Sequence, residues 1–63
     1  MSHHDDLARI DHRIAWAKEL IRLNEYFDQE HPNTPSIQLM LSSARADLKY
    51  WEGLRQEVER HAG

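Results

Sequence analysis

The stretch EHPNTP, residues 30–35, decides the fold because it ends one helix and begins another. Pro32 clashes with a helical backbone at the residue before it, so a helix arriving from the N-terminal side should end near Glu30. Thr34 followed by Pro35 is typical of an N-cap and a first helical residue, where proline sacrifices only an amide without an intrahelical partner. A connection of about four residues joins neighbouring antiparallel helices in bundles. The sequence therefore predicts a helical hairpin.

The length of the chain bounds its organisation. With 63 residues and no cysteine, the chain buries little apolar surface and has no disulfide or thiolate zinc site, so oligomerisation is the usual remaining support. We interpret residues 1–63 as one domain, with a first helix over about 5–30, a turn at 31–34 and a second helix over about 35–62. The predicted fold is all-α, an antiparallel two-helix hairpin that dimerises into a four-helix bundle.

The charge and hydropathy of the chain restrict its partners. A formal net charge of −3 argues against a nonspecific binder of nucleic acid or anionic membranes. No apolar run approaches the roughly 20 residues that span a membrane. The first six residues lack the basic and apolar regions of a signal peptide. We therefore expect a cytoplasmic location and no membrane contact.

A heptad-like seam is predicted to join the two helices. Apolar residues recur at spacings of 3 and 4 in the first helix, and the second helix has a matching stripe, so each set lies on one side of its helix. Asn24 interrupts the seam near the turn, where it either fixes the register of the helices or is solvated. The predicted intrachain core consists of Leu7, Ile10, Ile14, Ala17 and Ile21 in the first helix and of Ile37, Leu41, Ala44, Leu48, Trp51 and Val58 in the second.

The first helix has a second apolar series on another side. At about 100° per residue, this series is centred well over 100° around the helix from the seam. The two together form an apolar arc of roughly 200°, wider than the stripe that one partner helix covers. We expect a second copy of the chain to cover the series; a groove for a different protein and a higher oligomer are the alternatives. The series consists of Trp16, Leu20, Leu23 and Phe27.

The turn end of the predicted hairpin is acidic. Between Arg22 and Arg45 there is no lysine or arginine, whereas three carboxylates fall there, namely Glu25, Asp28 and Glu30. They occupy the last turns of the first helix, where the helix dipole prefers cations, so each costs roughly a few tenths of a kcal/mol. Such clusters are usually solvated. The alternative is a docking tip for a basic partner.

The sequence contains no convincing arrangement for chemistry. Zinc needs three or four converging ligands, but His31 lies at the turn end and the other four histidines fall at the opposite end of the hairpin. Ser43 and Asp47 resemble the Ser-x-x-x-Asp pair of the short helical-hairpin aspartyl-phosphate phosphatases of sporulation, although the residues between them differ from that family. We predict no cofactor, no metal and no enzymatic activity, and keep a phosphatase-like or metal-binding hairpin as a lesser alternative.

The length and hairpin plan resemble the Rop family of plasmid copy-number regulators, whose bundles bind RNA. An RNA-binding bundle face should carry a stripe of basic residues near aromatic ones. Here Arg9 and Arg13 lie on one side of the first helix and Lys18 and Arg22 on another, so no continuous stripe forms. We interpret the chain as a non-enzymatic protein–protein interaction module, a regulator, inhibitor or adaptor whose partners are itself and an unidentified protein. A Rop-like RNA-binding regulator is the alternative.

Overall fold

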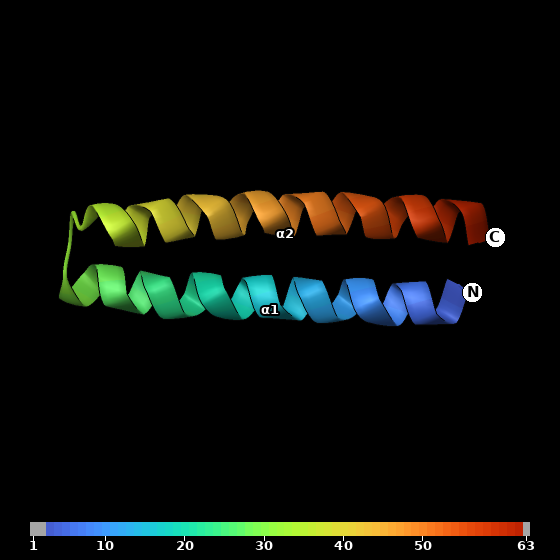
Figure 1. Cartoon of the computed structure of the whole chain (residues 1–63), viewed down its shortest axis with the longest axis horizontal. Coiled ribbons are helices and arrows are strands. Elements are labelled where there is room, and N and C mark those ends of the chain that lie inside the picture. The colour runs from blue at the N-terminus through green and yellow to red at the C-terminus, as the bar shows by residue number, and fades with distance from the viewer. Residues whose placement is uncertain (1–2, 63) are drawn as a thin grey trace.

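The structure, a computed structural model, is an antiparallel pair of helices; it describes residues 3–62, with side chains from 6 to 61. Helix α1 spans His3–Glu30 and α2 spans Pro35–Ala62. They lie side by side as a rod of 45 × 14 × 14 Å, with both ends of the chain at the same end of the rod (Figure 1). The prediction of an all-helical hairpin is confirmed. Helix α1 begins at His3 rather than near residue 5, a difference typical of fraying helix ends.

Helix α1 ends where Pro32 requires. The last backbone bond of helical spacing runs from the His31 amide to the Phe27 carbonyl at 2.8 Å, and the helix ends at Glu30. Asn33 then adopts a left-handed backbone with φ of 65°. Asparagine tolerates this region better than most residues because its short polar side chain can bond locally. The sharp reversal of the chain is concentrated at this one residue.

Helix α2 begins at Pro35, but Thr34 does not cap it in the way the sequence predicted. The Thr34 hydroxyl donates a hydrogen bond of 2.7 Å to the carbonyl of His31, so the side chain closes the turn. The backbone carbonyl of Thr34 accepts the first helical bond, from the Gln38 amide at 3.1 Å. The position of the helix start agrees with the prediction, and the role of the threonine side chain differs from it.

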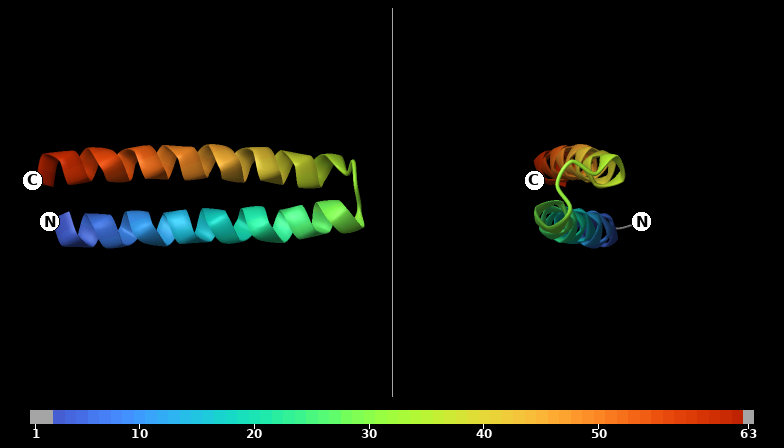
Figure 2. Two further views of the ribbon diagram at one scale, coloured as in Figure 1. Left: turned by 180° about the vertical axis from the view of Figure 1, so that it is seen from behind. Right: turned by 90° about the vertical axis from the view of Figure 1, so that its left-hand side faces the viewer.

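The seam between the helices forms a thin core. The apolar residues most withdrawn from solvent are Ile10, Ile14, Ala17, Leu41 and Ala44. The other residues of the predicted core are only half-buried, namely Leu7, Ile21, Ile37, Leu48, Trp51 and Val58. Two helices meet along a single line, and within residues 3–62 no third element covers either side of that line, as the end-on view in Figure 2 shows. Only side chains of α1 and α2 themselves can therefore cover the two edges of the seam.

Asn24 lies inside the seam rather than in solvent. Its side chain is only 8% exposed, and its Nδ2 donates a hydrogen bond of 2.8 Å to the carbonyl of Leu20, one turn earlier in α1. The interpretation that Asn24 is solvated near the turn is therefore wrong. The bond satisfies the buried amide within its own helix.

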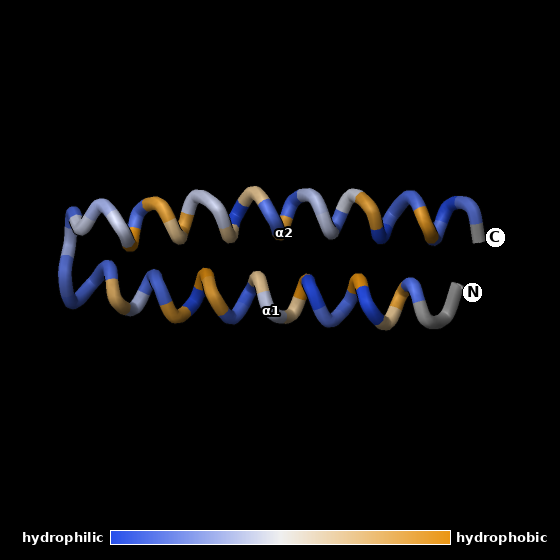
Figure 3. The backbone as a smooth tube through the Cα atoms, viewed as in Figure 1, coloured by the Kyte–Doolittle hydropathy of each residue, from blue (hydrophilic) through white to orange (hydrophobic). Residues whose placement is uncertain are grey.

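Hydropathy is distributed differently on the two helices. Apolar segments of α2 are mostly turned toward α1, whereas those of α1 occur both toward α2 and away from it (Figure 3). Within the residues described, neither helix offers an apolar stretch long enough to cross a membrane. Packing of α1 against α2 therefore leaves part of the apolar surface of α1 uncovered.

Candidate interaction surface

One long edge of the hairpin, which we call the polar flank, is closed by polar contacts between the helices. Among the side chains described, these contacts join Asp11 to Arg55 at 3.0 Å, Glu25 to Arg45 at 3.3 Å and Asp28 to Gln38 at 2.6 Å. The contacts occur near both ends of the rod, so they also fix the register of α1 against α2. A surface of paired charges is already satisfied and well solvated, and it needs no partner.

The opposite edge, which we call the apolar flank, carries the second apolar series of α1. Trp16 is 57% exposed, Leu23 46% and Phe27 40%, while Leu20 is half-buried. Arg13, one turn before Trp16, continues this line, and its guanidinium lies 5.9 Å from the ring centroid of Trp51 in α2. That contact places the series on the side of the seam away from the polar flank. We call Trp16, Leu20, Leu23 and Phe27 the α1 row.

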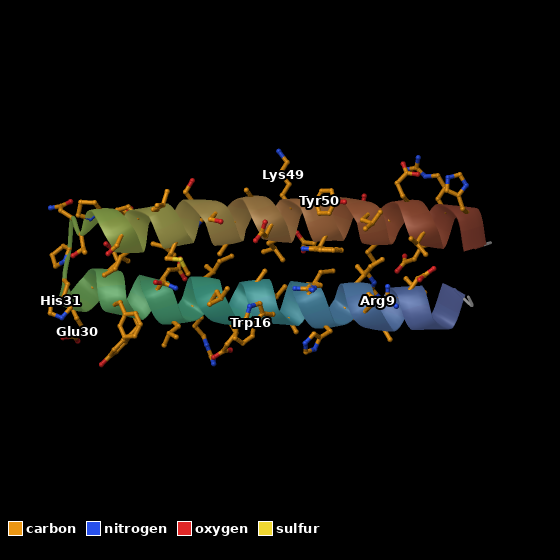
Figure 4. The ribbon with its side chains drawn as sticks, viewed as in Figure 1. Arg9, Trp16, Glu30, His31, Lys49 and Tyr50 are labelled. Atoms are coloured by element: carbon orange, nitrogen blue, oxygen red, sulfur yellow. The ribbon has the colours of Figure 1, made fainter. Side chains whose placement is uncertain are left out.

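Helix α2 contributes a half-polar row to the same apolar flank. At spacings of 4 and 3 this α2 row consists of Ser36, Met40, Ser43, Asp47, Tyr50 and Leu54. Tyr50 is 63% exposed, and its ring meets Trp51 edge-on with centroids 5.1 Å apart. Figure 4 shows Tyr50 on α2 and Trp16 on α1, while the neighbouring Lys49 points away from α1. Met40 and Tyr50 were not placed on this surface from the sequence. The signal that could have done so is helical spacing, because both residues share one side of α2 with Leu54.

Two of the three carboxylates at the acidic turn end have polar partners in α2, and one of these partners is a cation. Arg45 lies 20 residues from Glu25 along the chain but reaches it across the hairpin, and Asp28 accepts a hydrogen bond from Gln38. Among the described side chains, only Glu30 of the three carboxylates lacks such a partner. Charge counted along the sequence misses this pairing because antiparallel helices bring distant residues together. Among the described side chains, no lysine or arginine pairs with Asp28 or Glu30, and Glu30 lies on the apolar side of α1.

A small basic patch lies at the other end of α1. Arg9, His12, Arg13 and Trp16 line one shallow surface pocket. The patch does not extend along the helix, because Arg22 pairs with Glu19 at 2.8 Å. Hydrogen bonding to Glu19 and its negative charge raise the pKa of Arg22.

The described residues do not assemble a metal centre. Among the side chains that the structure describes, those of residues 6–61, no group of three or more histidines, aspartates or glutamates could hold an ion. His61 and Glu57 approach to 3.3 Å, one turn apart on the exposed face of α2. The side chains of His3 and His4 lie outside those described. Ser43 and Asp47 both lie in the exposed α2 row.

Comparison with family models, with curated proteins and with solved structures finds no match to this chain.

Proposed function

We propose that the protein is a non-enzymatic protein–protein interaction module of the cytoplasm, a small regulator, inhibitor or adaptor that works as a homodimeric four-helix bundle. The observation that carries this proposal is the exposure of the α1 row in the single chain. Large apolar side chains gathered along one edge mark an interaction site on a soluble domain. Trp16 and Phe27 are residue types that concentrate binding energy in interfaces.

The thinness of the hairpin supports the same proposal. A rod 14 Å thick has room for one seam of side chains and no enclosed site for a substrate. The partly exposed seam also gives a single hairpin little stability of its own, since below about 70 residues one core rarely suffices. Covering the apolar flank with a second copy would bury the α1 row and the open edge of the seam together. Contact through the apolar flank would then both join the two copies and stabilise each hairpin.

The test is the oligomeric state of two matched variants. Leu23→Glu places a carboxylate in the α1 row, and we expect at least about a hundredfold weaker dimerisation, because burying an unpaired charge is costly. Leu39→Glu makes the same change at a leucine that is 72% exposed on the outer side of α2, and it should leave the dimer intact. Sedimentation across a range of concentrations measures both. A wild-type monomer would disprove the homodimer, and a Leu23→Glu dimer as tight as wild type would show that the α1 row is not its interface.

A second candidate, an RNA-binding regulator, is favoured by the basic patch. Arg9, Arg13 and Trp16 place guanidinium groups beside an aromatic ring, a combination that stacks and pairs with RNA. Binding of a structured RNA should then weaken steeply as salt concentration rises, and Arg9→Ala should reduce it. Absence of RNA binding at low salt would remove this candidate. The interaction module is preferred because the patch covers only one end of α1.

A further inference from the structure

We propose that the two copies pack antiparallel, with the turn of one hairpin beside the chain ends of the other, so that α1 lies against α1 and Arg13 of each copy pairs with Glu30 of the other. This inference rests on the proposed homodimer and deepens it by naming the partner surface and its direction. It is carried by the order of side chains along the α1 row and by the charges at the two ends of that row.

Two-fold symmetry allows two ways of covering both apolar flanks in a four-helix bundle. In the first, the turns lie at the same end and the α1 row of each copy faces the α2 row of the other. In the second, the turns lie at opposite ends, so α1 faces α1 and α2 faces α2. The two arrangements bury different pairs of residues and can be compared on that basis.

The first arrangement buries a carboxylate against apolar side chains. The contacts of Asp11 with Arg55 and of Asp28 with Gln38 fix the register of the hairpin. That register puts Asp47 of the α2 row at the height between Trp16 and Leu20. With the turns together, Asp47 of one copy would therefore be pressed against these two side chains of the other. An ionised carboxylate in such surroundings is strongly unfavourable.

The second arrangement packs the apolar α1 row of one copy against the α1 row of the other. An antiparallel contact centred between Leu20 and Leu23 places these two opposite each other and places Trp16 opposite Phe27 of the second copy. The apolar residues of the α1 row thus bury one another, with the largest side chain beside another aromatic ring. The α2 rows then meet along all six of their residues, of which Ser36, Ser43 and Asp47 are polar, and this half-polar composition suits a wetter contact.

The charged residues at the two ends of the α1 row, Arg13 and Glu30, also favour the antiparallel register. The same alignment puts Arg13 opposite Glu30 of the second copy. Among the described side chains, neither forms an ion pair within its own chain, whereas the carboxylates and guanidinium groups on the polar flank do so. Opposite charges that meet across an interface fix its direction more than its strength. Packing α1 parallel to its own copy would instead oppose Arg13 to Arg13 and Glu30 to Glu30.

The direction of packing can be measured with one label per chain. The chain has no cysteine, so His31→Cys gives a single labelling site at the exposed turn. In the antiparallel dimer residue 31 lies opposite His12 of the second copy, so two spin labels should be about 30 Å apart at 1.5 Å rise per residue. With the turns together they would be roughly 15 Å apart. A dimer that shows the short distance disproves the antiparallel register while leaving the homodimer intact.

The pairing itself is tested by exchanging charges. Arg13→Glu should weaken the dimer about tenfold, because it opposes two carboxylates at both ends of the interface. The double variant Arg13→Glu with Glu30→Arg should recover wild-type affinity. Lys18→Glu, the same change of charge toward the polar flank, is the control and should leave the dimer unchanged. If Arg13 acted only through its contact with Trp51, the second change would rescue nothing, and that outcome would disprove the pairing.

Discussion

The two flanks of this hairpin are built by the same helices, yet one is closed and the other is open. On the polar flank, Arg45 and Arg55 reach across the groove to carboxylates of α1, so both helices are tied without any third element. On the apolar flank, Trp16 and Phe27 stand exposed beside a half-polar row of α2. The difference teaches that the two edges of one small hairpin can differ in kind: one edge carries contacts that set the register within the chain, and the other carries the exposed apolar side chains on which the proposed dimer depends.

The cause of the difference lies in which residues flank the heptad seam. On one side of the α1 seam, every seventh residue is charged, namely Asp11, Lys18 and Glu25. On the other side, the equivalent positions include the apolar residues Leu20 and Phe27. Exposed ion pairs contribute little stability but remain soluble. Exposed apolar residues contribute only when covered, at about 25 cal/mol per Å². Any stability that the proposed dimer adds to the single hairpin should therefore come from the apolar flank.

The largest effect is expected at the seam that both flanks share. Leu41→Ala removes most of a side chain that is 3% exposed, and we expect the free energy of unfolding to fall by about 2–3 kcal/mol. Urea unfolding followed by circular dichroism, at one fixed protein concentration, measures it. Leu39→Ala, on the exposed outer side of α2, is the matched control. If the two variants lost the same free energy of unfolding, burial of Leu41 in the seam would not be what stabilises the hairpin.

A smaller gain is expected at a position that belongs to neither flank. Gly53 lies in the middle of α2, and a Cβ built there meets nothing within 4 Å. Gly53→Ala should therefore raise the free energy of unfolding by about 0.5–1 kcal/mol through helix propensity alone. Dimer affinity measured by sedimentation should stay unchanged. A variant that dissociates more readily would place an interface on this outer side of α2.

The smallest effect is expected within the polar flank. Glu25 and Arg45 are both more than half exposed, so a double-mutant cycle with alanine at each position should give a coupling of about 0.2–1 kcal/mol. Raising the salt concentration should reduce it further. A coupling above about 2 kcal/mol would indicate that this flank is desolvated, as it would be inside an interface, and would reverse the roles assigned to the two edges.

The architecture was readable from the sequence because its signals are local. Pro32 and Pro35 determine where α1 ends and α2 begins, and the structure places both boundaries accordingly. The residues predicted for the core lie along the seam, buried or half-buried, because helical spacing alone decides which face they share. The left-handed backbone at Asn33 and the hydroxyl bond of Thr34 were not predictable, since several turn geometries suit the same residues.

The candidate surface was readable only in part. The α1 row follows from spacing within one helix, and it lies exposed where the second series was predicted. The acidic tip depended on charge counted along the chain, and Arg45 alters that count through a contact between residues 20 apart. The contribution of Tyr50 to the apolar flank required knowledge of which side of α2 lies along the α1 row, which the contact of Arg13 with Trp51 indicates. The spacing of residues within one helix does not show which residues of the other helix they meet, and both of these features depend on that.

The proline at position 32 has a consequence for how copies of this chain can associate. Its ring lacks an amide hydrogen and clashes with the preceding turn, so the chain cannot straighten into one uninterrupted helix. Trading helices between molecules through such a straightened form, one way in which hairpins become intertwined dimers, is therefore disfavoured. In the proposed dimer, two copies would instead meet as finished hairpins and could part again without unravelling.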